Sequence, residues 1–141
     1  VPLTPVAMRE GVIAANNILH GLDRRRPDYR AVPSVVFTLP KLASAGLQES
    51  EARDAGRDIE VRFKDTSGWL HNQRMNEGFT GSKIILEKKT RAILGAHILD
   101  SHADDLINVF ALAMEQGLTA EKIRDVLYAY PTATSSIQYM V

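Results

Sequence analysis

The middle of the chain carries the alternation of apolar and charged positions that is typical of a β-strand. Between Asp58 and Asp65, three apolar residues fall on one face and the charged residues on the other: Ile59, Val61 and Phe63. Because successive side chains of a strand point to opposite faces, this pattern predicts a half-exposed strand at the surface of a sheet.

Residues 79–100 predict two more strands, joined by the polar turn at 87–91. The second of them, at 92–99, is apolar on both faces, which is typical of a strand in the centre of a sheet. Gly95 within it predicts that another backbone segment approaches closely. Residues 34–38 are β-branched and aromatic and predict a further short strand, which ends before a proline.

Helical spacing marks the start of the chain. Residues 4–20 predict a helix, with Thr4 as its N-cap and Pro5 at the first helical position, where a missing N–H costs nothing. Gly21 is placed to end this helix. Residues 47–56 are acidic at their start and close on a glycine, which predicts a short exposed helix.

The end of the chain predicts further helices. Ser101 is expected to cap a helix over 102–117, whose apolar stripe is wide enough to pack on two sides. Thr119 is expected to cap a second helix that runs to Tyr130, and residues 135–141 again carry apolar side chains at helical spacing. Strands in the middle and helices gathered at the end predict an α+β fold, an antiparallel sheet with helices packed on it.

Two stretches predict no regular structure. Residues 66–78 form a loop, and residues 22–34 form a polar linker with two prolines. The three arginines of the linker could touch phosphate, but a short basic run between acids is more often a solvated connector.

Composition narrows the classes of function. The 141 residues contain 17 basic and 17 acidic side chains, so the basic excess of a nucleic-acid binder is missing. There is no cysteine, which excludes disulfides, thiolate metal sites and thiol catalysis within these residues. No apolar run reaches membrane-spanning length and nothing indicates export, so we expect a cytoplasmic protein. The chain enters a helix almost at once, which suggests a piece of a longer protein.

Three places offer candidate chemistry. The start of the first helix presents backbone N–H groups, which suit a phosphate or the pyrimidine edge of a flavin, although any helix start offers them. The Tyr130–Pro131 bond is a plausible cis peptide, and such a bend can aim a side chain into a neighbour's site or merely turn the chain. Residues 100–105 contain histidine and aspartate, but the helix dipole already explains acids there, so we expect no metal site.

Five segments, in this order, resemble the C-terminal part of the pyridine nucleotide–disulfide oxidoreductases, the family of glutathione reductase, dihydrolipoamide dehydrogenase and mercuric reductase. They cover most of the chain and lie at 2–11, 32–52, 91–107, 111–123 and 130–132. The resemblance implies that residues 1–25 are the C-terminal helix of an FAD-binding domain. It implies that residues 26–141 are the interface domain, which pairs two subunits as a homodimer.

The resemblance also implies site residues. In the family, the backbone at the start of the first helix meets the flavin's pyrimidine edge, and this role falls here to Thr4, Pro5, Val6 and Ala7. The cofactors implied for the whole protein are FAD and NAD(P)H. In the family, the final helices of one subunit complete the active site of the other, and the resemblance implies the same here.

The chain departs from the family pattern at its end. Tyr130 stands where the classical reductases carry a proton-carrying histidine, and Ser135 stands where they carry the glutamate that orients it. Tyrosine is a poor base at neutral pH, because a phenol has a reference pKa of about 10, and serine cannot stabilise an imidazolium. Lys41, which follows Pro40, also replaces the acid that the family usually carries after this proline. Tyrosine resembles mercuric reductase, but that enzyme's terminal cysteine pair is missing.

We therefore expect the dimerisation domain of an FAD-dependent NAD(P)H oxidoreductase, with no turnover by this chain alone. One alternative is a purely structural dimerisation module, in which Tyr130 only packs at the interface. A second is a parent enzyme that acts on a substrate other than a disulfide. A third is an unrelated ligand-binding α+β domain.

Overall fold

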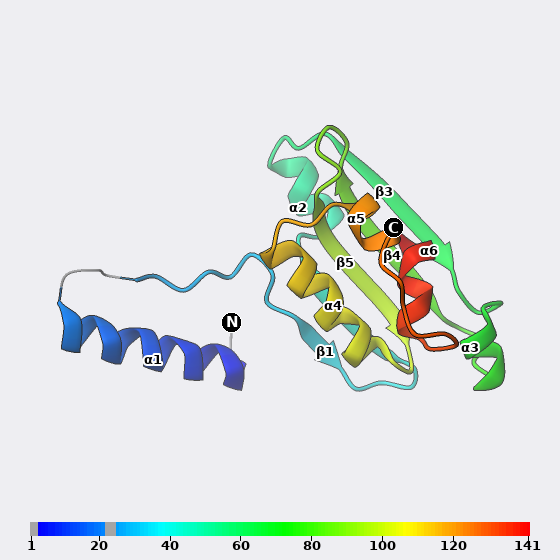
Figure 1. Cartoon of the computed structure of the whole chain (residues 1–141), viewed down its shortest axis with the longest axis horizontal. Helices are drawn as coiled ribbons and strands as arrows, with labels where there is room; N and C mark the ends of the chain where they lie inside the picture. The colour runs from blue at the N-terminus through cyan, green and yellow to red at the C-terminus, as the bar shows by residue number, and fades with distance from the viewer. Residues whose placement is uncertain (1–2, 22–24) are drawn as a thin grey trace.

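The structure is a computed structural model, which describes residues 3–21 and 25–141; the first residues of the expected linker lie outside these ranges. Helix α1 (Thr4–His20) lies at one end of the molecule, and an extended segment connects it to a sheet covered by helices (Figure 1). Gly21 ends α1 in the left-handed conformation, as predicted. The helix spans the predicted residues 4–20, but its N-cap is Leu3 and not Thr4.

Five antiparallel strands form one sheet in the order β1-β2-β5-β4-β3, which confirms the predicted fold class and the central place of β5. Their bounds are β1 (Ser34–Val36), β2 (Lys41–Gly46), β3 (Ile59–Asp65), β4 (Gly81–Glu87) and β5 (Ile93–Asp100). No strand was predicted at β2, because its small residues carry little β-branched or aromatic signal.

Helices cover one face of this sheet. Helix α4 (Ala103–Glu115) lies across β2 and β5, and the tail packs beside it as η1 (Thr134–Ser136) and α6 (Ile137–Met140) (Figure 1). Phe110, Leu106 and Ile107 of α4 are fully buried there. They meet the inward side chains of the central strands and of α6: Ala43, Ala45, Ile84, Leu86, Ala96, Ile98, Ile137 and Met140. Burial of these apolar side chains is the main term that stabilises the domain.

The other face of the sheet is covered only in part. Helix α2 (Glu49–Asp54), predicted from the sequence, packs Ala52 against Ile59 and Ile85 at one end. At the other end Phe63 is 72% exposed, although Ile59, Val61 and Phe63 share a face as predicted. The alternation therefore located the strand correctly but could not show that α2 covers only half of its face.

One helix was missed and two predicted helix boundaries were wrong. Residues 66–78 were expected to lack regular structure but contain α3 (Leu70–Arg74). Helix α5 (Ala120–Arg124), capped by Thr119 as predicted, ends well before Tyr130. Helix α4 has His102 and not Ser101 as its N-cap, and no side chain caps its first turn. The backbone N–H of His102 donates to the Asp100 carboxylate at 2.8 Å.

The close approach predicted at Gly95 is confirmed. The chain leaves β2 and crosses β5 so that the Leu47 N–H donates to the Leu94 carbonyl at 2.8 Å. A Cβ atom on Gly95 would lie 2.0 Å from the carbonyl oxygen of Leu47, which is a backbone atom and cannot turn away. Only glycine fits here without moving one of the two segments.

We expect Gly95→Ala to lower the free energy of unfolding by about 2–3 kcal/mol, because the added methyl group forces the two backbone segments apart. Urea denaturation followed by circular dichroism measures this. Gly78→Ala is the control, since a Cβ atom there meets nothing within 4 Å. Equal urea midpoints for Gly95→Ala and the wild type would contradict the close approach.

Lys41 joins the sheet to α4. Its ammonium group lies 2.7 Å from Asp104, with 29% and 27% of the two side chains exposed. The hydrogen bond from Lys41 lowers the pKa of Asp104, against the opposing effect of partial burial. The residue that departs from the family pattern is therefore used as an ion-pair partner within its own domain.

We expect Lys41→Met to lower the free energy of unfolding at pH 7 by about 0.5–1 kcal/mol, as for a partly screened ion pair. Because the pKa of Asp104 is lowered in the folded state, this contribution is complete above the ordinary aspartate pKa of about 3.9 and is lost as the pH falls further. Urea titrations at pH 7 and pH 3 should show the difference shrinking. Lys88→Met, which breaks the more exposed pair with Asp58, should change little at either pH.

Candidate functional site

The start of α1 presents backbone donors to the outside. Leu3, the N-cap, has no polar side chain that could accept from the first turn. Thr4, Pro5 and Ala7 are exposed, while Val6 is buried. Val6 therefore anchors the turn, and the N–H groups of Thr4 and Val6 stay available to an outside acceptor.

The first turn of α1 offers hydrogen-bond donors to an electron-rich group, such as the pyrimidine edge of a flavin. The open N–H groups and the positive end of the helix dipole both favour an acceptor that carries negative charge. Pro5 lacks an N–H and Ala7 donates its own to Leu3, so the donors are Thr4 and Val6. Of the four predicted residues, Thr4 and Val6 are therefore the ones that could donate a backbone hydrogen bond to such a group.

The first turn of α1 also faces α4, the helix that covers the sheet. A hollow of about 370 Å³ is lined by Pro5 and Val6 of α1 and by Ala111 and Leu112 of α4. The Tyr29 hydroxyl of the connector donates to Glu10 of α1, and this hydrogen bond raises the pKa of Tyr29. The connector thereby ties α1 to the rest of the chain.

The tail turns Tyr130 outward. The Tyr130–Pro131 peptide bond is cis, as the sequence suggested. Tyr130 is 76% exposed and Leu127 is 99% exposed. Tyr128 behaves in the opposite way: its hydroxyl donates to the Ile123 carbonyl at 2.9 Å, and burial raises its pKa. The segment after α5 thus tucks one tyrosine inward and presents the other to the surroundings.

Ser135 is turned into its own loop. It is 5% exposed, and its hydroxyl donates to the Thr132 carbonyl at 2.6 Å. Its backbone N–H donates to the Thr132 hydroxyl at 3.0 Å, which in turn donates to the Ala129 carbonyl. Ser135 therefore stiffens the turn after Tyr130 and does not face the phenol.

The two predicted halves of the site do not meet within one chain. The start of α1 lies beside Ala111 and Leu112 of α4, whereas η1 and α6 lie on the other side of α4, toward β3 and β4 (Figure 1). Each half is exposed, and each lacks the other.

Metal ligation finds no support in the described ranges. Across residues 3–21 and 25–141, no three histidine or acidic side chains gather in a way that could hold an ion. The Asp100 and Asp104 carboxylates of the segment considered above are engaged by His71 and Lys41.

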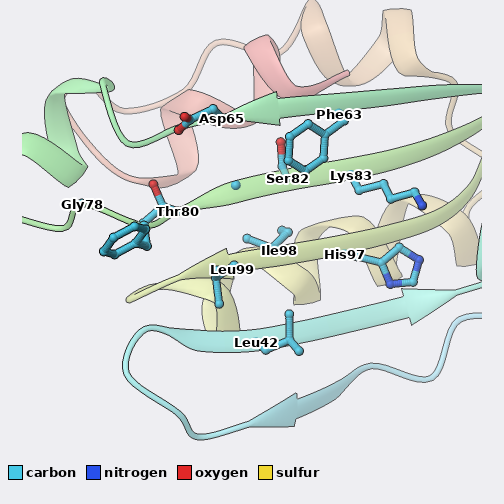
Figure 2. A pocket seen from close by; sticks show the side chains of 12 residues that line it. Leu42, Phe63, Asp65, Gly78, Thr80, Ser82, Lys83, His97, Ile98 and Leu99 are labelled. Atoms are coloured by element: carbon cyan, nitrogen blue, oxygen red, sulfur yellow. The ribbon is translucent and has the colours of Figure 1, made fainter.

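An open apolar face was not predicted as a site. Phe63, Phe79 and Leu42 line a shallow hollow of about 370 Å³ over the uncovered end of the sheet, with Lys83 and His97 at its edge (Figure 2). The only sequence signal for it is the alternation along β3, which also fits a surface covered by a helix. None of the described helices is long and apolar enough to cross a bilayer.

Comparison with known proteins gives consistent matches. The family model described as "Pyridine nucleotide-disulphide oxidoreductase, dimerisation domain" matches residues 32–141, which leaves α1 outside it. An "Uncharacterized 19.7 kDa protein in mercuric resistance operon" of Staphylococcus aureus is 40% identical over all of this chain and 78% of its own length. The mercuric reductase of Staphylococcus aureus is 36% identical over 94% of this chain but only 24% of its own length.

Solved structures agree. The HOCl-induced flavoprotein disulfide reductase RclA from Escherichia coli superposes with a TM-score of 0.89 at 28% identity, over 99% of this chain and 32% of that protein. The superposition therefore includes α1 as well as the sheet. With the family model matched over most of its length, the chain belongs to the family of pyridine nucleotide-disulphide oxidoreductase dimerisation domains.

Proposed function

We propose that this chain is the dimerisation region of an FAD-dependent oxidoreductase that uses NAD(P)H, and that it forms a homodimer. The observation that carries the proposal is the separation of the two half-sites. The open first turn of α1 lies beside the end of α4, whereas the segment that contains Tyr130 leads into η1 and α6 on the other side of α4 (Figure 1). Tyr130 itself is 76% exposed. A two-fold pairing would place Tyr130 of one copy at the flavin edge held by the other.

The N-terminal residues would position the cofactor. Thr4 and Val6 would donate their backbone N–H groups to the pyrimidine edge of the isoalloxazine, and the helix dipole would favour negative charge there. When bound, FAD supplies the two-electron chemistry between NAD(P)H and the substrate. Pro5 fixes the backbone of this turn and Val6 anchors it, so the donors would be held in place before the cofactor binds.

Tyr130 would act as a hydrogen-bond donor in the partner's pocket. Its phenol is exposed, and Ser135, which occupies the place of the family's glutamate, is engaged with Thr132. No acid–base dyad is formed by these two residues, so a substrate other than a disulfide fits the tail as well as a disulfide does. Hg(II), which the name of one relative suggests, is such a substrate.

We assign residues 1–25 to the end of a preceding FAD-binding domain and residues 26–141 to the dimerisation domain. Support comes from α1, which exposes an unusual share of large apolar side chains: Met8, Val12, Ile18 and Leu19. An exposed apolar helix face is typical of an element that packs on a further domain. We place the whole protein in the cytoplasm.

A purely structural dimerisation module is the second candidate. The observation that favours it is the match to a relative of only 19.7 kDa, of which this chain spans 78%. In that case Leu127 and Tyr130 would serve only as apolar contacts between two copies. Both candidates require the same interface, and they differ in whether the Tyr130 hydroxyl contributes to turnover.

We expect the chain to be a dimer that buries more than about 2,000 Å² in total, and we expect Leu127→Asp to dissociate it. Because Leu127 is 99% exposed, the charge disrupts the interface without entering the core. Sedimentation measures the mass and circular dichroism the fold. Phe79→Asp, at a side chain 82% exposed beside the open sheet face, is the matched control and should leave the dimer intact. A wild-type monomer at high micromolar concentration, or dissociation by Phe79→Asp alone, would contradict this interface.

In the flavin-loaded protein that contains this chain, we expect Tyr130→Phe to lower kcat/KM about 10- to 100-fold, the effect of losing one hydrogen bond to a charged group. Steady-state oxidation of NADH and NADPH is measured with Hg(II), lipoamide and oxidised glutathione as acceptors. Phenylalanine keeps the ring, so dimer mass should not change. Unchanged kinetics with the acceptor that the wild type prefers would favour the purely structural candidate.

A further inference from the structure

Three side chains far apart in the sequence form one hydrogen-bonded chain beneath the tail. Asp100, the last residue of β5, is fully buried, and its Oδ2 lies 3.0 Å from Nε2 of His71 in α3. The Nδ1 of His71 lies 3.1 Å from the Ser136 hydroxyl of η1. His71 thus joins the central strand of the sheet to the segment that follows the Tyr130 turn.

The chain of bonds has a defined direction. An ionised carboxylate only accepts hydrogen bonds, and the Oδ1 of Asp100 already accepts the backbone N–H of His102 at 2.8 Å. Nε2 of His71 therefore carries the proton that bonds Oδ2. In the neutral ring Nδ1 is then the acceptor, and the Ser136 hydroxyl donates to it. The Ser136 hydroxyl thus donates to His71, and His71 donates to Asp100.

The imidazole is also held from its sides. The ring of Trp69 meets it edge-on with centroids 6.4 Å apart, and the ring of His102 does so at 6.3 Å. Trp69 makes a second edge contact, at 6.2 Å, with Tyr139 of α6. Contacts of this geometry favour one orientation of the His71 ring.

The bond to Ser136 has no equivalent elsewhere in this part of the tail. In the described parts of the chain, it is the single hydrogen bond that ties residues 129–136 to α3, α4 or the sheet; the others of this segment are local, as between Thr132 and Ser135. A hollow of about 520 Å³ separates the turn at 131–134 from His71 and His102. Packing therefore does not fix the turn on that side.

The same residue types serve as a nucleophilic triad in hydrolases, but the geometry here does not support that chemistry. Ser136 is 9% exposed, and the adjoining hollow is lined by Thr132, Ala133 and Thr134 instead. A substrate carbonyl would have no direct access to the Ser136 hydroxyl.

We propose that His71 is the positioning residue of the tail: its ring transmits the fixed position of buried Asp100 to Ser136 and so holds the Tyr130 turn in the place from which it meets a second copy. This inference rests on the proposed function for its purpose, but the contact itself belongs to one chain. His71 acts through Ser136 and touches neither cofactor nor substrate.

Amide hydrogen exchange of the tail tests the proposal. The N–H groups of Ser135, Ser136 and Ile137 are bonded within the turn and report its opening. We expect Ser136→Ala to raise their exchange rates about tenfold, the equivalent of one hydrogen bond, while the Asp100–His71 pair stays intact. His71→Gln should raise these rates by a similar factor. The double variant should add little, because both substitutions break the same series of hydrogen bonds between Asp100, His71 and Ser136.

Controls separate positioning from general loss of stability. The amide of Ala96 in β5 should exchange as in the wild type when Ser136 is replaced. His97→Gln is the matched histidine control, since His97 is also half-buried and bonds a backbone oxygen, that of Leu47, at 3.2 Å. Tail exchange within twofold of the wild type in Ser136→Ala, or additive effects in the double variant, would overturn the proposal.

Sedimentation of the same variants distinguishes this inference from the proposed function. We expect Ser136→Ala to weaken the dimer about tenfold without altering Leu127 or Tyr130 themselves. If the wild type is a monomer and the tail of Ser136→Ala still exchanges faster than that of the wild type, the His71 contact is supported and the homodimer is contradicted. An intact dimer with unchanged tail exchange would support the homodimer and contradict the role of His71.

Discussion

The burial of β5 between β2 and β4, beneath α4, is the interaction on which the rest of the structure depends. Its centre can be crossed closely because Gly95 has no side chain in the path of the Leu47 carbonyl. Its last residue, Asp100, is fully buried and accepts hydrogen bonds both from the backbone N–H of His102, just before α4, and from His71. One strand therefore sets the sheet, the covering helix and the anchor of the tail.

Much of this could be predicted from the sequence where a local pattern carries the information. The two-sided apolar run of β5 predicted its central place, and Gly95 predicted the crossing, because both follow from side-chain size alone. Thr119 capped α5 as expected. The β2 strand was missed because its residues are mostly small, and their place in the sheet depends on pairing with β1 and β5. Helix α5 ends earlier than predicted because the chain after it turns to pack Tyr128 inward.

The candidate site also contains residues that the sequence could indicate and residues that only the structure reveals. Thr4 to Ala7 and Tyr130 were identified by a resemblance to a family, and the structure leaves all of them exposed except Val6, which is buried. The contact between His71 and Ser136 could not be foreseen, because 65 positions separate the two residues and neither has a local signal. Long-range polar contacts of this kind depend on the closed fold, which no short sequence pattern encodes.

The core and the proposed interface use different side chains. Phe110, Ile137 and Met140 are fully buried within one chain, whereas Leu127 and Tyr130 remain outside. The domain can therefore complete its own core before it meets a second copy, and association need not supply the stability of the fold. In the proposed dimer, the tail would present Tyr130 to the second copy in a constant place, because it is held through His71 by the buried Asp100 carboxylate. A flexible tail would lose more conformational entropy on binding.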